Sequence, residues 1–590
     1  MSNCRVRDVA VIGSPSTNTE MTIDLLQEAT EERLIGALTA FEAVQDGQPI
    51  ISVGQIVGIE LKNRWHEDSV FRNLIKRTGE IPPITNRQDT RTANLVVGAT
   101  FRQSANGFEP EVLGMVPPTG TRVYRVDQAL LDRLLEVYRS EIVYLGQAYA
   151  NDVLYPMWFK HFGSGPGGAG EAYHIGVFGK TGSGKSGLAK MMLCAYARHP
   201  QLGILVIDPQ GEFSLELSGT RVGQQGLPLD QVVRSQGRAI HVFRISDLQL
   251  DDWETFEEML VSLRFLEQLG IPSRSADNSR KAAEVIRNAL EGTHLLDNLG
   301  TEQAMGDALR AVADQNNATY IYTSARAREL QQRVQRLQDD RNRLAQVFNQ
   351  SWAPICQLFS AGQNRQRLFS YSAQQPGIIN MLLGSAEATG PRPVIVIDIS
   401  RRGNQRFWSE ELQRRILSKL LNILVSQATS SLSTQQSANV LVLLDEAHRH
   451  APSGKLEDDS EADRLRSLLR RAVRETRKYG IGWFFISQTL GGLDNEILQQ
   501  LRILAFGFGL ALGTEFDRLR DFVGGDKRAL ELYQSFRDPQ SFPRQDLQEF
   551  PFMAVGPVSP LAFSGKPLFF TAFTDPAKFL QANNLQVQRS

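Results

Sequence analysis

One octet of glycines and polar residues constrains the fold of this chain more than any other stretch. Residues 179–186 read Gly-Lys-Thr-Gly-Ser-Gly-Lys-Ser. An apolar run over residues 175–178 precedes them, and a helical pattern over residues 188–196 follows. Strand, glycine-rich loop and helix in this order form a P-loop. The octet therefore predicts an α/β domain with a site for a nucleoside triphosphate.

Each position of the loop has a chemical reason. The three glycines let the backbone curl so that its N–H groups point at phosphates. Lys185 would reach the terminal phosphates, and Ser186 would offer its hydroxyl to Mg²⁺. The N-terminus of the following helix adds its partial positive charge. We expect ATP and Mg²⁺ as cofactors, with these nucleotide-binding residues: Gly179, Lys180, Thr181, Gly182, Ser183, Gly184, Lys185, Ser186 and Gly187.

Length and charge narrow the class of protein. A chain of 590 residues is too long for one core, so we expect two or three domains. Its formal net charge of −1 does not by itself indicate nucleic-acid binding. A ring-shaped protein, however, can place basic side chains inside a channel and acidic ones outside. Three scattered cysteines, no signal peptide and no bilayer-length apolar stretch predict a cytoplasmic protein without a membrane partner.

The N-terminal part reads as short strands separated by turn signals, which predicts a small β-barrel over residues 1–125. The predicted strands include Ile50–Leu61, Asn94–Phe101 and Glu111–Val116. Residues 126–171 are predicted to be a helical connector over Asp127–Tyr149, followed by a glycine-rich linker or surface loop.

Strands and helices then alternate, which predicts a RecA-like P-loop core with a parallel sheet over residues 172–215 and 390–550. A helical insertion subdomain is predicted over 216–389, because so long a segment is no loop. Leu330, Val334, Leu337, Leu344 and Phe348 repeat in it near heptad spacing, typical of a helical hairpin or short coiled coil. We favour the alternative of solvated helices packed on the domain. Residues 551–590 are predicted to be a last β segment and tail.

A second motif completes the chemistry of an NTPase. The apolar run 440–444 ends in Asp445 and Glu446, which is the pattern of a Walker B strand. Asp445 would hold Mg²⁺, and Glu446 would orient and deprotonate the attacking water. The next apolar strand ends at Gln488, which would contact the γ-phosphate and the water as a sensor, or would satisfy backbone groups at the strand end.

Two further groups of residues are candidates for the site. Asp208 and Glu212 follow a predicted strand and would touch the metal and water network, or would cap the next segment. A predicted helix over Glu461–Lys478 carries a row of arginines, and such a row is usually a solvated face. Arg477 first, and Arg474 second, are our candidates for an arginine finger that reaches a neighbouring subunit's phosphate.

The tetrapeptide 445–448, Asp-Glu-Ala-His, is shared with helicases named for it, but those chains carry two motor cores and this one shows a single P-loop. His448 and His174 have an ordinary interpretation as packing or hydrogen-bonding residues.

With these motifs in order, the chain resembles the HerA family of hexameric DNA translocases, within the HerA and FtsK group of ATPases. The N-terminal barrel, the motifs and the late β segment together carry the resemblance, and the motifs are His174–Ser186, Asp208–Phe213, Asp445–Pro452, Arg474–Gly480 and Ser487–Thr489. The chain departs from the family pattern in Glu475-Thr476 before Arg477 and in a long polar insertion after the Walker B motif. These departures leave open which arginine is the finger.

The resemblance implies that Lys185, Ser186, Asp445 and Glu446 bind and hydrolyse ATP. It also implies Gln488 as sensor, Asp208 as a supporting acid, and a finger among residues 474–477 that completes a neighbour's site. Members of the family form homo-hexamers, thread double-stranded DNA and work with a NurA-type nuclease, and some relatives pair with sirtuin-like or other effectors against phage.

No motif that reads DNA sequence appears, which suits a translocase that grips the backbone. Candidate pore residues are Arg401, Arg402 and Arg406, with an exposed basic loop as the alternative. Three functions remain open: a DNA motor that feeds a nuclease in end processing or phage defence, an ATP-gated scaffold that regulates an effector, and a ring acting on protein. Hydrolysis stimulated by DNA would distinguish the first from the second.

Overall fold

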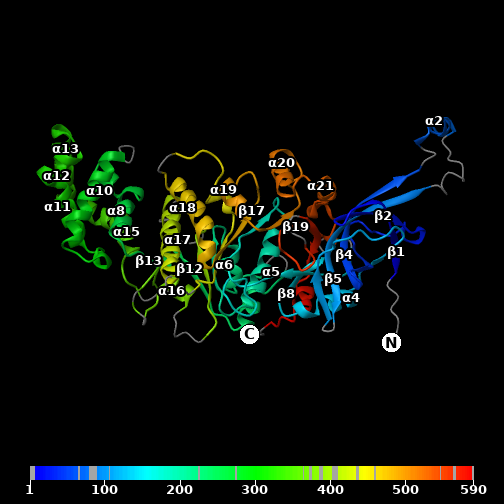
Figure 1. Cartoon of the computed structure of the whole chain (residues 1–590). Helices are drawn as coiled ribbons and strands as arrows, with labels where there is room; N and C mark the ends of the chain where they lie inside the picture. Colours follow the sequence, from blue (N-terminus) through cyan, green and yellow to red (C-terminus); the bar gives the residue numbers. More distant parts are fainter. Residues whose placement is uncertain are drawn as a thin grey trace.

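The computed structural model places three parts in a row (Figure 1). An N-terminal barrel lies at one end, an α/β core in the middle and a helical insertion at the other end. The residues described are 7–63, 67–78, 89–104, 107–149, 151–222, 226–272, 276–362, 365–370, 372, 375–384, 390–401, 410–432, 437–457, 460–544, 547–562 and 566–587.

The barrel forms because its strands bury one face around a shared apolar centre and leave the other to solvent. Six strands close a ring in the order β2-β1-β7-β3-β4-β5, since β5 pairs back onto β2, and β6 extends the sheet from β5. Their bounds are β1 Asp8–Ser16, β2 Glu20–Leu25, β3 Leu38–Gln45, β4 Gln48–Lys62, β5 Thr90–Ser104, β6 Gly107–Glu111 and β7 Arg122–Arg125. The predicted strand over Glu111–Val116 is wrong, because pairing ends at Glu111.

The hairpin of β4 and β5 extends beyond the barrel wall. Its pairing continues to Lys62 and Thr90, and the helix α2 (Ser69–Thr78) lies at its tip. Figure 1 shows this hairpin and α2 projecting away from the body of the molecule.

The core is one sheet of eleven strands in the order β12-β15-β11-β16-β17-β10-β18-β19-β20-β8-β9. The strands from β12 to β18 are parallel, and the last four are antiparallel to their neighbours. The predicted fold class is therefore confirmed, and the sheet is wider than the five predicted strands. The bounds are β8 Ile142–Ala148, β9 Leu154–Trp158, β10 Ile175–Phe178, β11 Gly203–Asp208, β12 Ile240–Arg244, β15 Val394–Asp398, β16 Val440–Leu444, β17 Ile481–Ser487, β18 Ile503–Gly507, β19 Phe550–Val555 and β20 Leu568–Ala572.

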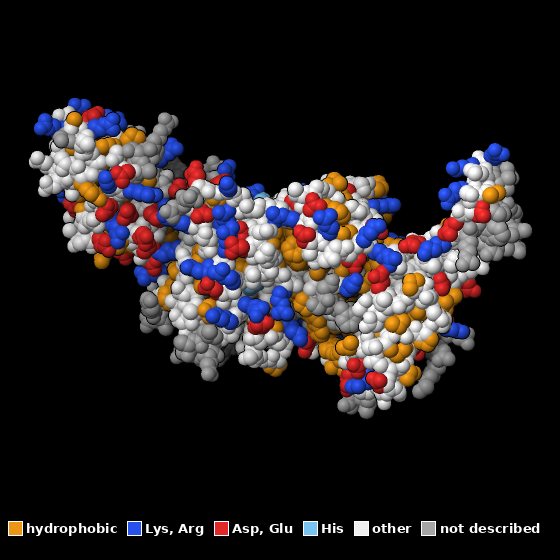
Figure 2. All heavy atoms as spheres, turned by 45° about the horizontal axis from the view of Figure 1, so that its top comes forward, with side chains coloured by type: hydrophobic (Ala, Val, Ile, Leu, Met, Phe, Trp, Pro, Cys, Tyr) orange, Lys and Arg blue, Asp and Glu red, His pale blue; other side chains and the backbone are white. Residues whose placement is uncertain are grey.

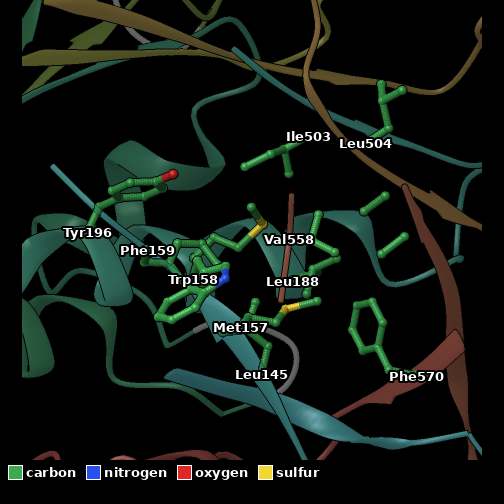
Figure 3. Close-up of a pocket in the computed structure, with 13 residues that line it drawn as sticks. Leu145, Met157, Trp158, Phe159, Leu188, Tyr196, Ile503, Leu504, Val558 and Phe570 are labelled. Atoms are coloured by element: carbon green, nitrogen blue, oxygen red, sulfur yellow. The ribbon is translucent and has the colours of Figure 1, made fainter. Parts of the chain in front are cut away.

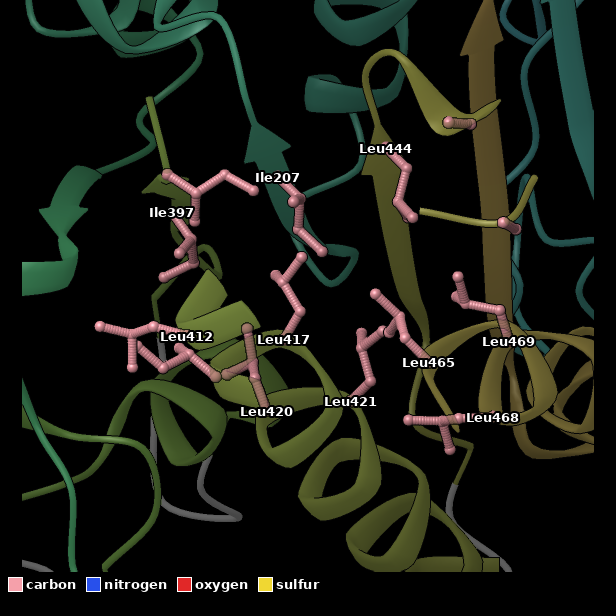
Figure 4. Close-up of a cluster of buried hydrophobic side chains, with 14 of the residues drawn as sticks. Ile207, Ile397, Leu412, Leu417, Leu420, Leu421, Leu444, Leu465, Leu468 and Leu469 are labelled. Carbon is pink, nitrogen blue, oxygen red and sulfur yellow. The ribbon is translucent and has the colours of Figure 1, made fainter. Parts of the chain in front are cut away.

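Helices cover the parallel sheet. Figure 4 shows leucines of α17 (Glu410–Leu432) and α18 (Glu461–Glu475) pointing toward Ile207, Ile397 and Leu444 of three neighbouring strands. All of the labelled side chains are buried, and each such burial contributes about 2 kcal/mol. This packing holds the strand ends, where the functional residues lie, in fixed positions.

The predicted helix over Asp127–Tyr149 is wrong beyond its first turns. The helix α4 spans Gln128–Leu134, and β8 and β9 then join the core sheet beside β20. The sequence of β8, Ile-Val-Tyr-Leu-Gly-Gln-Ala, carries the apolar density of a helix but pairs as a strand. The glycine-rich stretch that follows forms a loop with its own hydrogen bonds, such as Ala169 N–H to His161 C=O, which is the surface-loop alternative.

The insertion is mostly helical, as expected, although β12 within it joins the core sheet. The apolar repeat of residues 330–337 is buried against the other helices of the insertion rather than in an isolated coiled coil. Its principal helices are α8 Trp253–Ser262, α10 Ala276–Glu291, α11 Glu302–Ala313, α12 Gln315–Ile321, α13 Ser324–Asp339, α14 Arg341–Val347, α15 Ala353–Gln357 and α16 Ile378–Leu383.

The barrel and the core share buried hydrogen bonds. The side chain of Gln55 on β4, 1% exposed, donates from Nε2 to the carbonyl oxygens of Gly36 (2.6 Å) and Phe569 (2.8 Å). Its Oε1 accepts from the N–H of Phe569 on β20 (2.9 Å). One barrel side chain therefore satisfies both backbone groups of a core strand.

Candidate functional site

The P-loop has the backbone that its glycines predict. Gly179, Gly182 and Gly184 have φ angles of 152°, 82° and 86°, in the region that residues with a Cβ avoid. The helix α5 (Lys185–Ala197) begins directly behind the loop. The Nζ of Lys185 donates to the Lys180 carbonyl oxygen at 2.9 Å, which holds the ammonium over the loop.

A pocket of about 930 Å³ opens over the P-loop. The predicted residues from three separate motifs line it together: Thr181, Gly182, Gly184, Lys185, Ser186, Gly187, Asp445, Glu446 and Gln488. Strands β10, β16 and β17 lie in the middle of the parallel sheet and end at the same edge, so their following residues converge there. The volume and the convergent polar groups suit a nucleotide.

Asp445 follows the buried strand β16 and is 4% exposed. Burial, reinforced by the neighbouring carboxylates of Glu446 and Asp208, raises the pKa of Asp445 to about 7. A buried carboxyl in such surroundings is stabilised as an anion when a cation lies beside it. Asp445 lines the same pocket as the Ser186 hydroxyl, so this pair of oxygen donors fits Mg²⁺.

The two oxygens of Glu446 have different surroundings. Oε1 accepts from Gln210 Nε2 at 2.7 Å and from Gln488 Nε2 at 2.6 Å. Oε2 is buried and makes no hydrogen bond within the described residues. The backbone of Glu446 has φ of 47°, a left-handed conformation that costs a non-glycine residue of order 1 kcal/mol. The side chain is thus fixed through one oxygen, and the other is left to accept a proton.

Gln488 connects Glu446 to the P-loop. It follows the sensor strand β17, and its Oε1 accepts from the Thr181 hydroxyl at 3.0 Å while its Nε2 donates to Glu446. This geometry favours the sensor interpretation over that of a backbone cap, because Gln488 bonds through its side chain to two side chains of the pocket, Thr181 and Glu446.

Asp208 has the capping geometry that the sequence left as an alternative. Its Oδ1 accepts from the N–H groups of residues 210–212, and its Oδ2 accepts from the N–H and the hydroxyl of Ser214, each at 2.7 Å. With both oxygens used to hold the start of α6 (Glu212–Leu217), Asp208 acts on the pocket through its charge beside Asp445.

Glu212, the other acidic candidate, is paired with a lysine that the sequence argument overlooked. Lys190 on α5 is 5% exposed, and its Nζ contacts Glu212 and also Glu216 at 2.8 Å. All three side chains line the pocket beside the P-loop. Lys190 follows Lys185 by five residues, a spacing that does not place the two on one helix face, so the sequence carried no signal for its role.

His448 has a closer relation to the site than its packing interpretation suggested. Its Nδ1 lies 3.5 Å from Glu446 Oε2 and 3.2 Å from the Ser487 hydroxyl oxygen. Burial lowers the pKa of His448, an effect that the Glu446 carboxylate partly offsets. His448 therefore lies beside the Glu446 oxygen that makes no hydrogen bond within the described residues. Gln210, which donates to Glu446 Oε1, was also missed: it lies within the motif Asp208–Phe213, but only the acids of that motif were given a role.

His174 has the structural role that was expected. Its Nδ1 accepts from the Trp483 N–H at 3.2 Å, so its Nε2 donates to the Val473 carbonyl oxygen at 2.8 Å. Burial lowers the pKa of His174 to about 4, which keeps the ring neutral.

The predicted arginine row is shared between α18, which ends at Glu475, and a 3-10 turn over Thr476–Tyr479 that carries Arg477. Arg466 and Arg470 are bound within the chain, to Asp463 at 2.7 Å and to Asp494 at 2.5 Å. Arg474 and Arg477 are more than half exposed; Arg474 lies 3.7 Å from Glu475, and Arg477 lies 3.4 Å from Glu171. Neither of these two lines the pocket of its own chain.

Of the pore candidates, Arg401 is exposed at the end of the loop that follows β15. Arg402 and Arg406 lie outside the described residues.

A second, apolar cavity lies behind the P-loop helix (Figure 3). It measures about 20 Å³ and is lined by apolar side chains of α5, β8, β9 and β18, among them Leu188, Trp158 and Ile503. A space of this size holds no more than a water molecule, and its lining offers a water few partners. We assign it to packing.

Comparisons with known proteins identify the central part of the chain. Residues 172–424 match the family model described as the central domain of helicase HerA. A search of curated proteins found no match. No helix among the described residues has the length and apolar character that a membrane span requires.

Several solved structures are similar to this chain at low identity. VirB4 of Thermoanaerobacter pseudethanolicus has 15% identity and a TM-score of 0.37, over 74% of this chain and 97% of that one. The bacterial conjugative coupling protein TrwB has 11% identity and a TM-score of 0.36, over 76% and 92%. The genome packaging NTPase B204 of Sulfolobus turreted icosahedral virus 2 has 8% identity and a TM-score of 0.29, over 68% and 98%. Residues 172–424 are thus similar to the HerA central domain, and the predicted resemblance to HerA-type P-loop ATPases is confirmed for this part of the chain.

Proposed function

We propose that this protein is an ATP-driven motor that moves double-stranded DNA and works with a partner nuclease in DNA end processing or phage defence. One observation supports the ATPase activity: hydrogen bonds link the side chains of Thr181, Gln488 and Glu446 across the nucleotide pocket. The match of the central domain to a helicase family supports DNA as the substrate of the motor.

The chain's own residues divide the work of hydrolysis. The P-loop backbone and Lys185 bind the phosphates, and Ser186 with Asp445 holds Mg²⁺, which neutralises charge on the phosphate being transferred. Glu446 Oε2 takes the proton of the attacking water, while Oε1 stays fixed by Gln210 and Gln488. Gln488 also contacts the P-loop, so it reports the state of the γ-phosphate to β17.

The exposed arginines support an assembled ring as the working form. Arg474 and Arg477 face solvent outside their own pocket, which leaves them available to a neighbouring chain. We propose that Arg477, or Arg474, completes the ATP site of the next subunit of a homo-hexamer. Such a site hydrolyses ATP only after assembly.

The test is the ATPase rate of the purified protein with and without linear duplex DNA, with Glu446→Gln as the blank. The proposal expects a rate well above the blank that rises when duplex is added. A rate above the blank that is indifferent to DNA would overturn the motor and favour an ATP-gated scaffold for an effector. A parent rate equal to the blank would overturn the enzyme itself.

A further inference from the structure

The helical insertion carries a basic surface that hydrolysis does not use. It belongs to α13 and α14, and every one of its arginines is exposed: Arg326, Arg328, Arg333, Arg336, Arg341 and Arg343. Figure 1 places α13 at the end of the molecule farthest from the barrel, and Figure 2 shows Lys and Arg side chains gathered at that end.

The amphipathic pattern of α13 explains why these arginines face solvent. Leu330, Val334 and Leu337 are at most 5% exposed and pack into the core of the insertion. Because this apolar stripe faces inward, Arg328 and Arg336, eight residues apart, lie together on the outer side of the helix. The arrangement is fixed by the fold and does not depend on a flexible loop.

Most of these guanidinium groups lack an acidic partner. Arg333 pairs with Glu329 at 2.7 Å. Within the described part of the chain, the other five arginines form no ion pair at all. Glu329, Asp339 and Asp340 are the acids of these two helices, so six arginines against three carboxylates leave a formal charge of +3 over residues 324–347. Five unpaired cations on two short helices therefore form a positive surface.

The other side chains of this surface indicate the class of partner. Its other exposed positions are four neutral amides, three acids and two alanines: Gln332, Gln335, Asn342, Gln346, Glu329, Asp339, Asp340, Ala325 and Ala345. Among described residues 325–346, no large apolar side chain is exposed, whereas protein interfaces have an apolar centre. Arginine, asparagine and glutamine are the side chains that contact phosphates of the nucleic-acid backbone. The surface fits a polyphosphate backbone better than a protein.

We propose that α13 and α14 form a second contact with double-stranded DNA, made to its phosphates without regard to sequence. The proposal rests on the proposed function in that DNA is the motor's substrate. It adds a DNA-binding surface on the insertion that is separate from the ATP pocket, so DNA binding and ATP hydrolysis can be measured independently. Each arginine that neutralises a phosphate releases counterions and makes affinity depend on salt.

The test uses the full chain with Arg328, Arg336 and Arg343 all replaced by glutamine. The control replaces Arg122, Arg310 and Arg520, exposed arginines that each have an acidic partner, so that net charge changes equally. Affinity for a short linear duplex is measured across a series of salt concentrations. We expect weaker binding and a salt slope smaller by up to about 0.9 per lost contact in the first variant, with an unchanged slope in the control.

Several outcomes would overturn the proposal. They are an unchanged slope in the first variant, an equal loss in both variants, or a parent that binds no duplex. Displacement of duplex by poly-glutamate as readily as by competitor duplex would assign the surface to an acidic protein instead. The proposed function is tested separately. If the salt slope of duplex binding falls in the first variant but the ATPase rate of the parent does not respond to DNA, this contact is supported and the proposed function is overturned.

Discussion

At the scale of single residues, the asymmetry of Glu446 defines its expected role. Since its Oε1 only accepts hydrogen bonds, a glutamine can keep both contacts, to Gln210 and Gln488, through its own carbonyl oxygen. Glu446→Gln should therefore retain ATP binding and lower kcat about 10²–10⁴-fold, because only the proton acceptor is lost. Nucleotide binding by fluorescence titration and steady-state ATPase assays separate the two effects. Equal turnover in variant and parent would remove Glu446 from the mechanism.

His174 gives the fold a pH dependence with a definite sign. Its pKa is lowered to about 4 in the folded state, from an ordinary value of 6.5. The unfolded chain therefore takes up a proton in the window from pH 6.5 to pH 4 while the folded chain does not, so stability falls as the pH falls. His199 is half-buried and His450 is buried; burial lowers the pKa of each to about 4, so both act in the same direction.

We expect the parent to lose about 2 kcal/mol through His174 alone between pH 7 and pH 5. His174→Asn should be less stable at pH 7, because Trp483 loses a fitted partner, yet its urea midpoint should change less between these pH values. A variant whose midpoint shifts with pH as much as the parent's would show that His174 titrates normally.

Residue roles could be predicted from the sequence where the chemistry is local. The P-loop octet and the pair Asp445-Glu446 are recognised from neighbouring residues in the sequence, and the structure brings residues of both into one pocket. The contacts of Gln210 and His448 with Glu446 depend on how strand ends converge, which no spacing reveals. Asp208 had two possible roles on paper, and only the positions of the backbone N–H groups after β11 favour the cap.

At the scale of elements, β4 and β20 depend on one another through Gln55. Gln55→Leu would leave the N–H of Phe569 and the C=O of Gly36 buried without their partner, while the C=O of Phe569 would keep only the Tyr149 N–H. Each such group costs about 1–3 kcal/mol, so we expect a loss of several kcal/mol and a clearly lower Tm.

The matched control for Gln55 is Gln48→Leu, at the exposed start of the same strand. Its Tm should lie close to the parent's, because no buried group loses a partner. If the two variants melted together, the hydrogen bonds between barrel and core would carry no net stability.

The elements that sequence analysis predicted least well are those paired over long distances. Runs ending in a motif, such as β16 and β17, identify themselves by apolar content and by the polar residue that follows. The strand β8 could not be recognised, since its partner β20 lies near the other end of the chain and its own pattern resembles a helix. The buried face of α13 was visible in the heptad spacing, but its packing partners were not.

At the scale of the whole molecule, the proposed ring makes activity a property of pairs of chains. We expect Arg477→Ala to lower turnover, and Lys185→Ala to abolish nucleotide binding in its own subunit. Mixing the two variants should recover part of the activity. In a mixed ring, an Arg477→Ala subunit supplies an intact P-loop and a neighbouring Lys185→Ala subunit supplies an intact Arg477 to the same site. ATPase assays over a range of mixing ratios measure this recovery. Additive rates without recovery would place Arg477 in its own site or outside the chemistry.

The pairing of β8 with β20 also has a consequence for biosynthesis. A nascent chain exposes the β8–β9 hairpin (Ile142–Trp158) long before the strand that pairs with β8, which is β20 (Leu568–Ala572), has been synthesised. Until then the hairpin presents an open edge on which other chains can pair. The hydrogen bonds between Gln55 and Phe569 likewise form only after Phe569 has been synthesised. A polypeptide terminated before β20 would therefore keep its P-loop and Walker B motif yet lack the strand that joins β19 to β8, which ties completion of the core sheet to the synthesis of β20.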